Sequence, residues 1–203
     1  MGAAHLSRVR AWLGLLLVQT LAFWLPGCAT VTIIPPALPA DPVNVFVLDH
    51  GRTTSLAIAA SGGGLLRYAY GDWNYYALGK NDLWHGIAAL FWPTQSGLGR
   101  GELEGPATVQ SVQNQMPWLE AAHSVRVERA LALAFEWKME ALFDSLRDTQ
   151  VDNSLYRLSF VHYPRPYTVL WNSNHAVAAW LHELGCETRG WPLRASWRLA
   201  PAQ

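Results

Sequence analysis

The feature that most constrains the fold is an uncharged, apolar run over residues 11–24, closely followed by a cysteine, Cys28. Two arginines, Arg8 and Arg10, precede the run, and no acidic residue does. A positive start followed by a short apolar stretch is typical of a secretory signal peptide. The run is shorter than the ~20 residues that a membrane-spanning helix needs. The sequence therefore predicts that folding begins behind this segment.

Leu25, Gly27 and Cys28 stand where a bacterial lipobox has its leucine, its small residue and its lipid-bearing cysteine. Pro26 departs from that pattern, because a small or β-branched residue is more usual there. We predict a lipoprotein signal peptide over residues 1–27 and lipidation of Cys28; an uncleaved anchor helix is the alternative. Each buried CH₂ of the lipid contributes ~0.8 kcal/mol to anchoring. The residue after the cysteine is not an aspartate. By resemblance to diderm lipoproteins, this predicts that the protein is sorted to the outer membrane and faces the periplasm.

Four prolines follow the cysteine, at positions 35, 36, 39 and 42. Their density predicts a stiff, extended tether over residues 28–42. The rest of the chain, residues 43–203, is long enough for a single domain with its own hydrophobic core.

Composition narrows the classes of partner. The chain carries 15 basic and 15 acidic residues and no basic stripe, which gives no support for nucleic-acid binding. The histidines lack the spacing of metal ligands, so we expect no metal and no cofactor. The predicted partners are the membrane, through lipidated Cys28, and an envelope protein or a cell-wall or lipid ligand. Cys186 then has no disulfide partner, and we expect a buried, unreactive thiol.

Local patterns predict a mixed α+β fold. Short apolar runs separated by turn residues predict an antiparallel meander of strands over residues 43–48, 53–59 and 65–70. Apolar spacing and capping residues predict helices over residues 83–91, 125–147 and 174–184. Further strands are predicted over residues 108–112 and 155–163, with a glycine-rich loop over residues 94–105. The sequence thus predicts a small antiparallel sheet packed against helices.

Three short segments combine polar and aromatic residues as a site would. Residues 49–54 (Asp-His-Gly-Arg-Thr-Thr) form a turn between predicted strands, and residues 70–76 surround Asp72 with aromatic side chains. Residues 171–175 (Trp-Asn-Ser-Asn-His) open a predicted helix, where backbone N–H groups and the helix dipole favour a nucleophile or an oxyanion. Ser173 is the candidate nucleophile, and the alternative is that Ser173 or Asn172 only caps the helix.

Together these segments resemble a bacterial urease-region family of membrane-associated proteins with a domain of unknown function. Its pattern runs Ser-His-Gly-Trp-His-Thr-Gly, then Gly-Trp-Gly-Asp-x-x-Phe-Tyr, and later Cys-Asn-Thr-Trp before a helix. The matching residues here are His50, Gly51, Thr54, Gly71, Asp72, Tyr76 and Asn174. The family is distantly similar to permuted NlpC/P60 papain-like proteins. The resemblance implies a permuted papain-like α+β fold over roughly residues 43–190, with a cysteine at a helix start and a histidine at a strand start as the catalytic pair.

The departures from that family fall on the two catalytic positions. Ser173 stands in place of the cysteine and Thr53 in place of the histidine. Threonine does not accept a proton at neutral pH, and a serine nucleophile needs a positioned base. His50 is the candidate base, since His175 lies two residues from Ser173 on the helix and faces elsewhere.

Three functions therefore stay open. The first is a lipid-anchored envelope protein with a degenerate, non-catalytic domain, in which a ligand cleft or a structural surface is formed by Asp72, Trp73, Tyr75, Tyr76, Trp171 and Asn174. The second is a serine-dependent hydrolase or acyl or amide transferase acting on envelope substrates, with Ser173 as nucleophile and His50 as base. The third is an envelope assembly or interaction protein that uses its outer surface.

Overall fold

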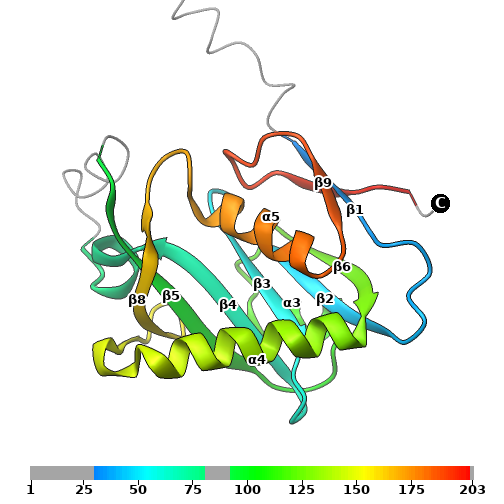
Figure 1. Ribbon diagram of the computed structural model, residues 1–203, viewed down its shortest axis with the longest axis horizontal. Helices are drawn as coiled ribbons and strands as arrows, with labels where there is room; N and C mark the ends of the chain where they lie inside the picture. Colours follow the sequence, from blue (N-terminus) through cyan, green and yellow to red (C-terminus); the bar gives the residue numbers. More distant parts are fainter. Residues whose placement is uncertain (1–29, 81–91, 202–203) are drawn as a thin grey trace, which may run out of the picture.

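The computed structural model describes residues 30–80 and 92–201, which form a mixed α+β fold around one large sheet (Figure 1). Seven strands pair antiparallel throughout, in the order β6-β2-β3-β4-β5-β8-β7. Their bounds are β2 Pro42–Asp49, β3 Thr54–Ala59, β4 Leu65–Asp72, β5 Thr94–Leu103, β6 Ala121–Glu128, β7 Val151–Asn153 and β8 Leu158–Tyr167. The α+β class is confirmed, and the prediction of a small sheet is wrong.

The predicted meander is confirmed as β2, β3 and β4, which pair in chain order. Its first turn closes through a hydrogen bond from His50 N–H to the Thr53 carbonyl (2.9 Å). Asp49 Oδ1 accepts from the backbone N–H of Gly51 (2.7 Å), whose φ of 86° suits glycine. The turn therefore fixes where His50 leaves the sheet.

Each face of the sheet has its own cover. Side chains alternate along a strand, so Val45 and Val47 face one side, and Phe46 and Leu48 face the other. The long helices α4 (Arg129–Ser145) and α5 (Ser173–Glu183) cover the first face. The short helix α3 (Val109–Gln115) packs on the second face, and the π-helical turn η2 (Trp73–Ala77) follows β4. The described residues cover the second face only in part, and this leaves room for a cavity.

A second, three-stranded sheet joins the two ends of the described chain. Strand β1 (Val31–Ile34) lies between β9 (Glu187–Arg189) and β10 (Trp197–Leu199), antiparallel to the first and parallel to the second. Val31 and Ile33 are fully buried. The predicted tether over residues 28–42 is therefore wrong at this strand, because the β-branched run Val-Thr-Ile-Ile outweighs the prolines that begin only at position 35.

Several predicted boundaries are also wrong. Residues 94–105, predicted as a loop, contain β5, because its glycines leave space for neighbouring side chains: a Cβ on Gly99 would lie 2.7 Å from Phe160. Residues 108–112, predicted as a strand, begin α3, and residues 125–128 belong to β6 rather than to the next helix. Strand β8 continues through Pro164 and Pro166, where its ladder with β5 is irregular and prolines are tolerated. The helix predicted over residues 83–91 lies outside the described residues.

The last predicted helix is confirmed as α5, with Asn172 as its N-cap. The side chain of Asn172 accepts from the backbone N–H groups of Asn174 (3.0 Å) and His175 (3.3 Å). Within residues 30–80 and 92–201, no helix is long and apolar enough to span a bilayer.

Candidate functional site

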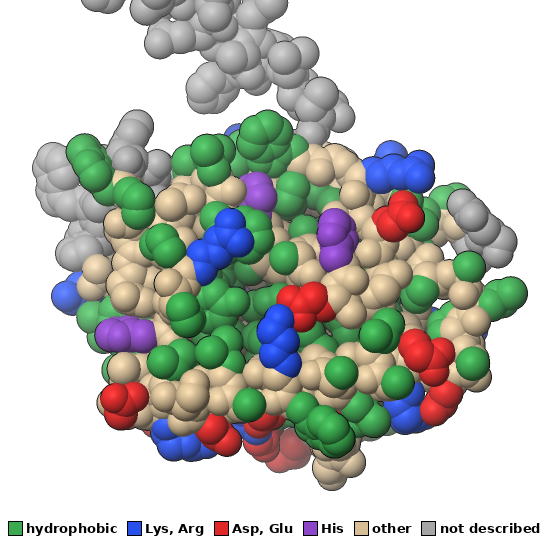
Figure 2. Space-filling view, in the orientation of Figure 1, with side chains coloured by type: hydrophobic (Ala, Val, Ile, Leu, Met, Phe, Trp, Pro, Cys, Tyr) green, Lys and Arg blue, Asp and Glu red, His purple; other side chains and the backbone are tan. Residues whose placement is uncertain are grey.

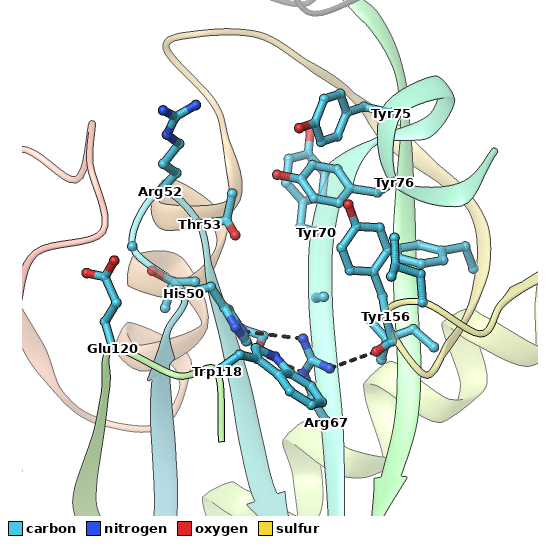
Figure 3. Close-up of a pocket in the computed structure, with 17 residues that line it drawn as sticks. His50, Arg52, Thr53, Arg67, Tyr70, Tyr75, Tyr76, Trp118, Glu120 and Tyr156 are labelled. Atoms are coloured by element: carbon cyan, nitrogen blue, oxygen red, sulfur yellow. Dashed lines mark hydrogen bonds between the residues drawn. The ribbon is translucent and has the colours of Figure 1, made fainter. Parts of the chain in front are cut away.

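A cavity of about 630 Å³ lies on the second face of the sheet, between the β2–β3 turn, strand β4 and the aromatic residues behind it. Figure 3 shows Arg67 at its base, with His50 and Tyr156 on either side. Aromatic side chains supply much of the lining: Tyr70, Tyr75, Tyr76, Trp118, Tyr156 and Phe160. Its size falls within the range of small-molecule sites.

Arg67 projects from the centre of β4 into the base of the cavity and is only 6% exposed. Its Nε donates to Ser55 Oγ (3.0 Å), Nη1 to the Tyr156 carbonyl (3.1 Å) and Nη2 to His50 Nε2 (3.3 Å). Burial lowers the pKa of Arg67 to about 10, so the guanidinium stays charged at neutral pH. None of the ion pairs in the described part of the chain involves Arg67. Arg67 is thus a desolvated positive charge without an ion-pair partner among the described residues, and Glu120 is the acidic residue of the lining.

His50 Nε2 contacts Ser55 Oγ (2.8 Å) beside Arg67. Burial first, and the charge of Arg67 second, lower the pKa of His50 to about 3. The imidazole is therefore neutral and accepts hydrogen bonds at Nε2. A serine beside a histidine has the geometry of a nucleophile and its base. A base with so low a pKa takes few protons near pH 7, so this arrangement favours ligand binding over proton transfer.

The aromatic side of the cavity depends on two features of the chain behind β4. Asp72 caps η2, because its Oδ1 accepts from the backbone N–H of Tyr75 (2.8 Å), and its other oxygen accepts from the hydroxyl of Thr94. The ring of Tyr76 lies directly on the backbone of Gly71, where a Cβ would be 2.3 Å from Cδ2 of that ring. The two features together fix where Tyr75 and Tyr76 enter the cavity.

The predicted binding residues thus separate into two groups. Tyr75 and Tyr76 line the cavity, and His50 does as well. Asp72 is a buried cap, and Trp73 packs against His162 (ring centroids 4.3 Å apart) outside the cavity lining. These two residues support the position of the aromatic side chains, and the structure gives neither a place in the lining.

Ser173 and Asn174 belong to a buried polar cluster on the first face of the sheet. Thr54 Oγ1 donates to Asn174 Oδ1 (2.7 Å) and accepts from Trp197 Nε1 (2.8 Å). The backbone N–H of Thr54 points at Ser173 Oγ (3.4 Å), and Ser173 is 2% exposed. This buried polar cluster joins β3, α5 and β10.

The structure does not bring Ser173 and His50 together. Ser173 contacts Thr54, whereas His50 contacts Ser55, the next residue of the same strand. Consecutive strand residues point to opposite faces of a sheet. Among the described residues no hydrogen bond joins Ser173 to His50, and Ser173 is absent from the cavity lining.

Trp171, the remaining predicted residue, precedes α5 in the chain. The guanidinium of Arg165 lies over its ring, 3.1 Å from the centroid, in a cation–π contact. Trp171 does not line the cavity. Its indole N–H is buried without a hydrogen-bond partner among the residues that the structure describes.

Arg67 and Ser55 are residues of the site that the sequence does not predict. Arg67 gives a signal, since a single charged residue in the apolar run Leu-Leu-Arg-Tyr-Ala of a strand is unusual. Over residues 30–80 and 92–201, no cluster of three or more histidine, cysteine or acidic side chains is placed to hold a metal ion. Comparison with protein-family models, curated proteins and solved structures gives no match for this chain. Function is therefore argued from the cavity.

Proposed function

We propose that this protein is a ligand-binding domain held at the cell envelope, and that its cavity takes a small molecule with an anionic group and an apolar or aromatic body. The observation that carries the proposal is Arg67, a buried cation without an ion-pair partner among the described residues. Burying an unpaired charge is costly, and a bound anion would offset that cost. Arginine has five N–H donors, and three bonds of Arg67 are made inside the protein. The other two donors are available to a ligand.

The rest of the ligand is defined by the rings around the cavity. Tyr76 packs against Tyr75 and Tyr156, with ring centroids 4.9 and 5.4 Å away. Burial raises the pKa of Tyr70 to about 12 and that of Tyr76 further, so both hydroxyls stay neutral. Aromatic rings with neutral hydroxyls suit an apolar body that carries few polar groups. A cell-wall fragment or a lipid-derived acid fits this description.

The degenerate papain-like origin remains part of the proposal. The start of α5, with Ser173, packs against β3 where the resembled family has its catalytic pair. Ser173 is buried, and within the described ranges it forms no hydrogen bond with a histidine. Both observations support the loss of catalysis.

Removing the charge of Arg67 should weaken anion binding. Benzoate and phenyl phosphate, with benzamide as the neutral comparison, are the probes, and ligand-observed NMR gives the dissociation constants. A hydrogen bond to a charged group contributes ~1.5–3 kcal/mol, so Arg67→Met should weaken benzoate binding about 10- to 150-fold. Arg126→Met is the matched control, since Arg126 is exposed and is not part of the lining. Equal binding of benzoate and benzamide would contradict the anion site.

The catalytic alternative has its own expected result. The contact between Ser55 Oγ and His50 Nε2 (2.8 Å) is the observation that favours a serine-dependent hydrolase. With the pKa of His50 near 3, we expect no labelling by a serine-reactive fluorophosphonate at pH 7.5. Labelling that Ser55→Ala removes and Ser173→Ala retains would replace the binding proposal with a catalytic one.

The envelope location rests on Cys28 and is tested separately. In cells fed a labelled fatty acid, the parent chain should incorporate the label, and Cys28→Ala should not. Cys186→Ala is the control, since its thiol is buried and should not receive lipid. Incorporation into Cys28→Ala would refute lipidation at that cysteine.

A further inference from the structure

Two loops lie side by side at one edge of the molecule and expose large apolar side chains there. Residues 168–172 connect β8 to α5, and residues 190–196 connect β9 to β10. Asn172 Nδ2 donates to the Leu193 carbonyl (3.1 Å), which holds the loops together. Three exposed residues form what we term the edge patch: Leu170 (63% exposed), Trp191 (58%) and Leu193 (43%). Figure 2 shows hydrophobic side chains at the corresponding upper edge.

The edge patch lies where the chain enters the fold. A Cβ on Gly190 would lie 2.6 Å from the carbonyl oxygen of Thr30, and the hydroxyls of Thr30 and Ser196 are 3.2 Å apart. Cys28 precedes Thr30 by two residues, which span at most ~7 Å when fully extended. Whatever anchors Cys28 or the apolar run before it thus holds this edge close to the anchor.

The three segments that form and border the edge patch carry positive charges, and the carboxylate of Glu120 lies against Gly51 in the first of them. Residues 50–55, 164–175 and 190–196 contain three arginines and no aspartate or glutamate. The arginines Arg52, Arg165 and Arg194 are all exposed. Asn174 Nδ2 contacts both the Arg52 and the Leu193 carbonyls (3.4 Å each), so the first segment borders the other two. Basic residues close to an anionic bilayer are attracted to its surface.

We infer that the edge patch inserts into the interface of a bilayer that contains anionic lipid. Tryptophan and leucine at an exposed edge are the residues that bury at the headgroup boundary. The arginines beside them match the sign of the lipid charge. The inference rests on the envelope anchoring proposed above, and it adds an orientation: the molecule stands on this edge, and α4 faces away.

The test uses the full chain reconstituted in vesicles. Leu193→Cys carries an environment-sensitive fluorophore, and Trp137→Cys is the matched control on α4, since Trp137 is 70% exposed. Parent chain treated in the same way supplies the background from the native cysteines. With phosphatidylcholine and phosphatidylglycerol at 3:1, nitroxide-labelled lipid should quench position 193 at least twofold more than position 137. Arg165→Gln combined with Arg194→Gln should reduce that difference.

Four results would overturn the inference. The first is equal quenching at positions 193 and 137. The second is a blue-shifted label at 193 that lipid nitroxides do not reach, because residues 11–24 or another protein would then cover the patch. Equal quenching at 193 with and without the two arginines would remove the role of anionic lipid. Vesicle flotation reports anchoring by itself: a chain that does not float refutes the anchoring and, with it, this inference. Trp191→Cys repeats the measurement if Leu193→Cys does not fold.

Discussion

Lowering the pH from 7 to 5 is expected to weaken the folded state by about 2 kcal/mol through His50 alone. Burial and the neighbouring Arg67 lower the pKa of His50 from 6.5 to about 3 in the folded protein. Below pH 6.5, His50 binds a proton in the unfolded chain but not in the folded protein. The contribution of His50 to the free energy of unfolding is therefore fully present above pH 6.5. It falls by ~1.4 kcal/mol per pH unit until the pH approaches 3.

Urea unfolding followed by tryptophan fluorescence at pH 7, 6 and 5 measures this effect, with the full chain in mild detergent. His50→Gln should remove about 2 kcal/mol of the loss between pH 7 and pH 5. Burial also lowers the pKa values of His123 and His175, which adds to the loss, whereas burial raises the pKa of Asp49, which opposes it. The variant should therefore keep a smaller pH dependence. The same slope for parent and variant would show that His50 does not resist protonation.

Replacing Thr54 with valine should destabilise the protein by about 2–4 kcal/mol, although the shape of the side chain is conserved. The hydroxyl of Thr54 donates to Asn174 Oδ1 and accepts from Trp197 Nε1, both in the buried polar cluster. Valine leaves both partners buried without a hydrogen bond, and each unsatisfied group costs ~1–3 kcal/mol. Because the cluster joins β3, α5 and β10, the three elements should loosen together.

Thr188→Val is the matched control for this substitution. Its hydroxyl contacts His182 Nε2 (2.8 Å) in a solvent-exposed hydrogen bond of β9, so the loss should stay within ~0.5 kcal/mol. Unfolding by urea at pH 7 compares the two variants. A Thr54→Val chain as stable as Thr188→Val would mean that water replaces the lost hydroxyl and that the cluster contributes little.

The sequence predicts the elements whose signals are local. The meander follows from alternation and turn residues within 30 residues of chain, and α5 follows from a capping asparagine and helical spacing. Strand β5 was missed because its glycines read as a loop, and only the approach of Phe160 from β8 explains them. The second half of β6 is predicted as helix because its apolar residues run without a break into those of α4.

The cavity is less predictable because its polar contacts join distant strands. His50, Tyr75 and Tyr76 were found from short motifs, and they do line it. Arg67 meets His50 and Ser55 only through the pairing of β3 with β4. The predicted Ser173–His50 pair requires both residues to contact the same face of β3, and they contact opposite faces. A shift of one residue, from Thr54 to Ser55, moves a contact to the opposite face.

The three-stranded sheet has a consequence for the order in which the protein is made. Strand β1 is among the first parts of the described fold to be synthesised, and its partners β9 and β10 are among the last. During synthesis, β1 therefore has no strand partner until β9 is present, and its sheet is complete only with residue 199. An early-made strand is thus among the last to pair, and a chain cut short after α5 would leave β1 unpaired and open to degradation.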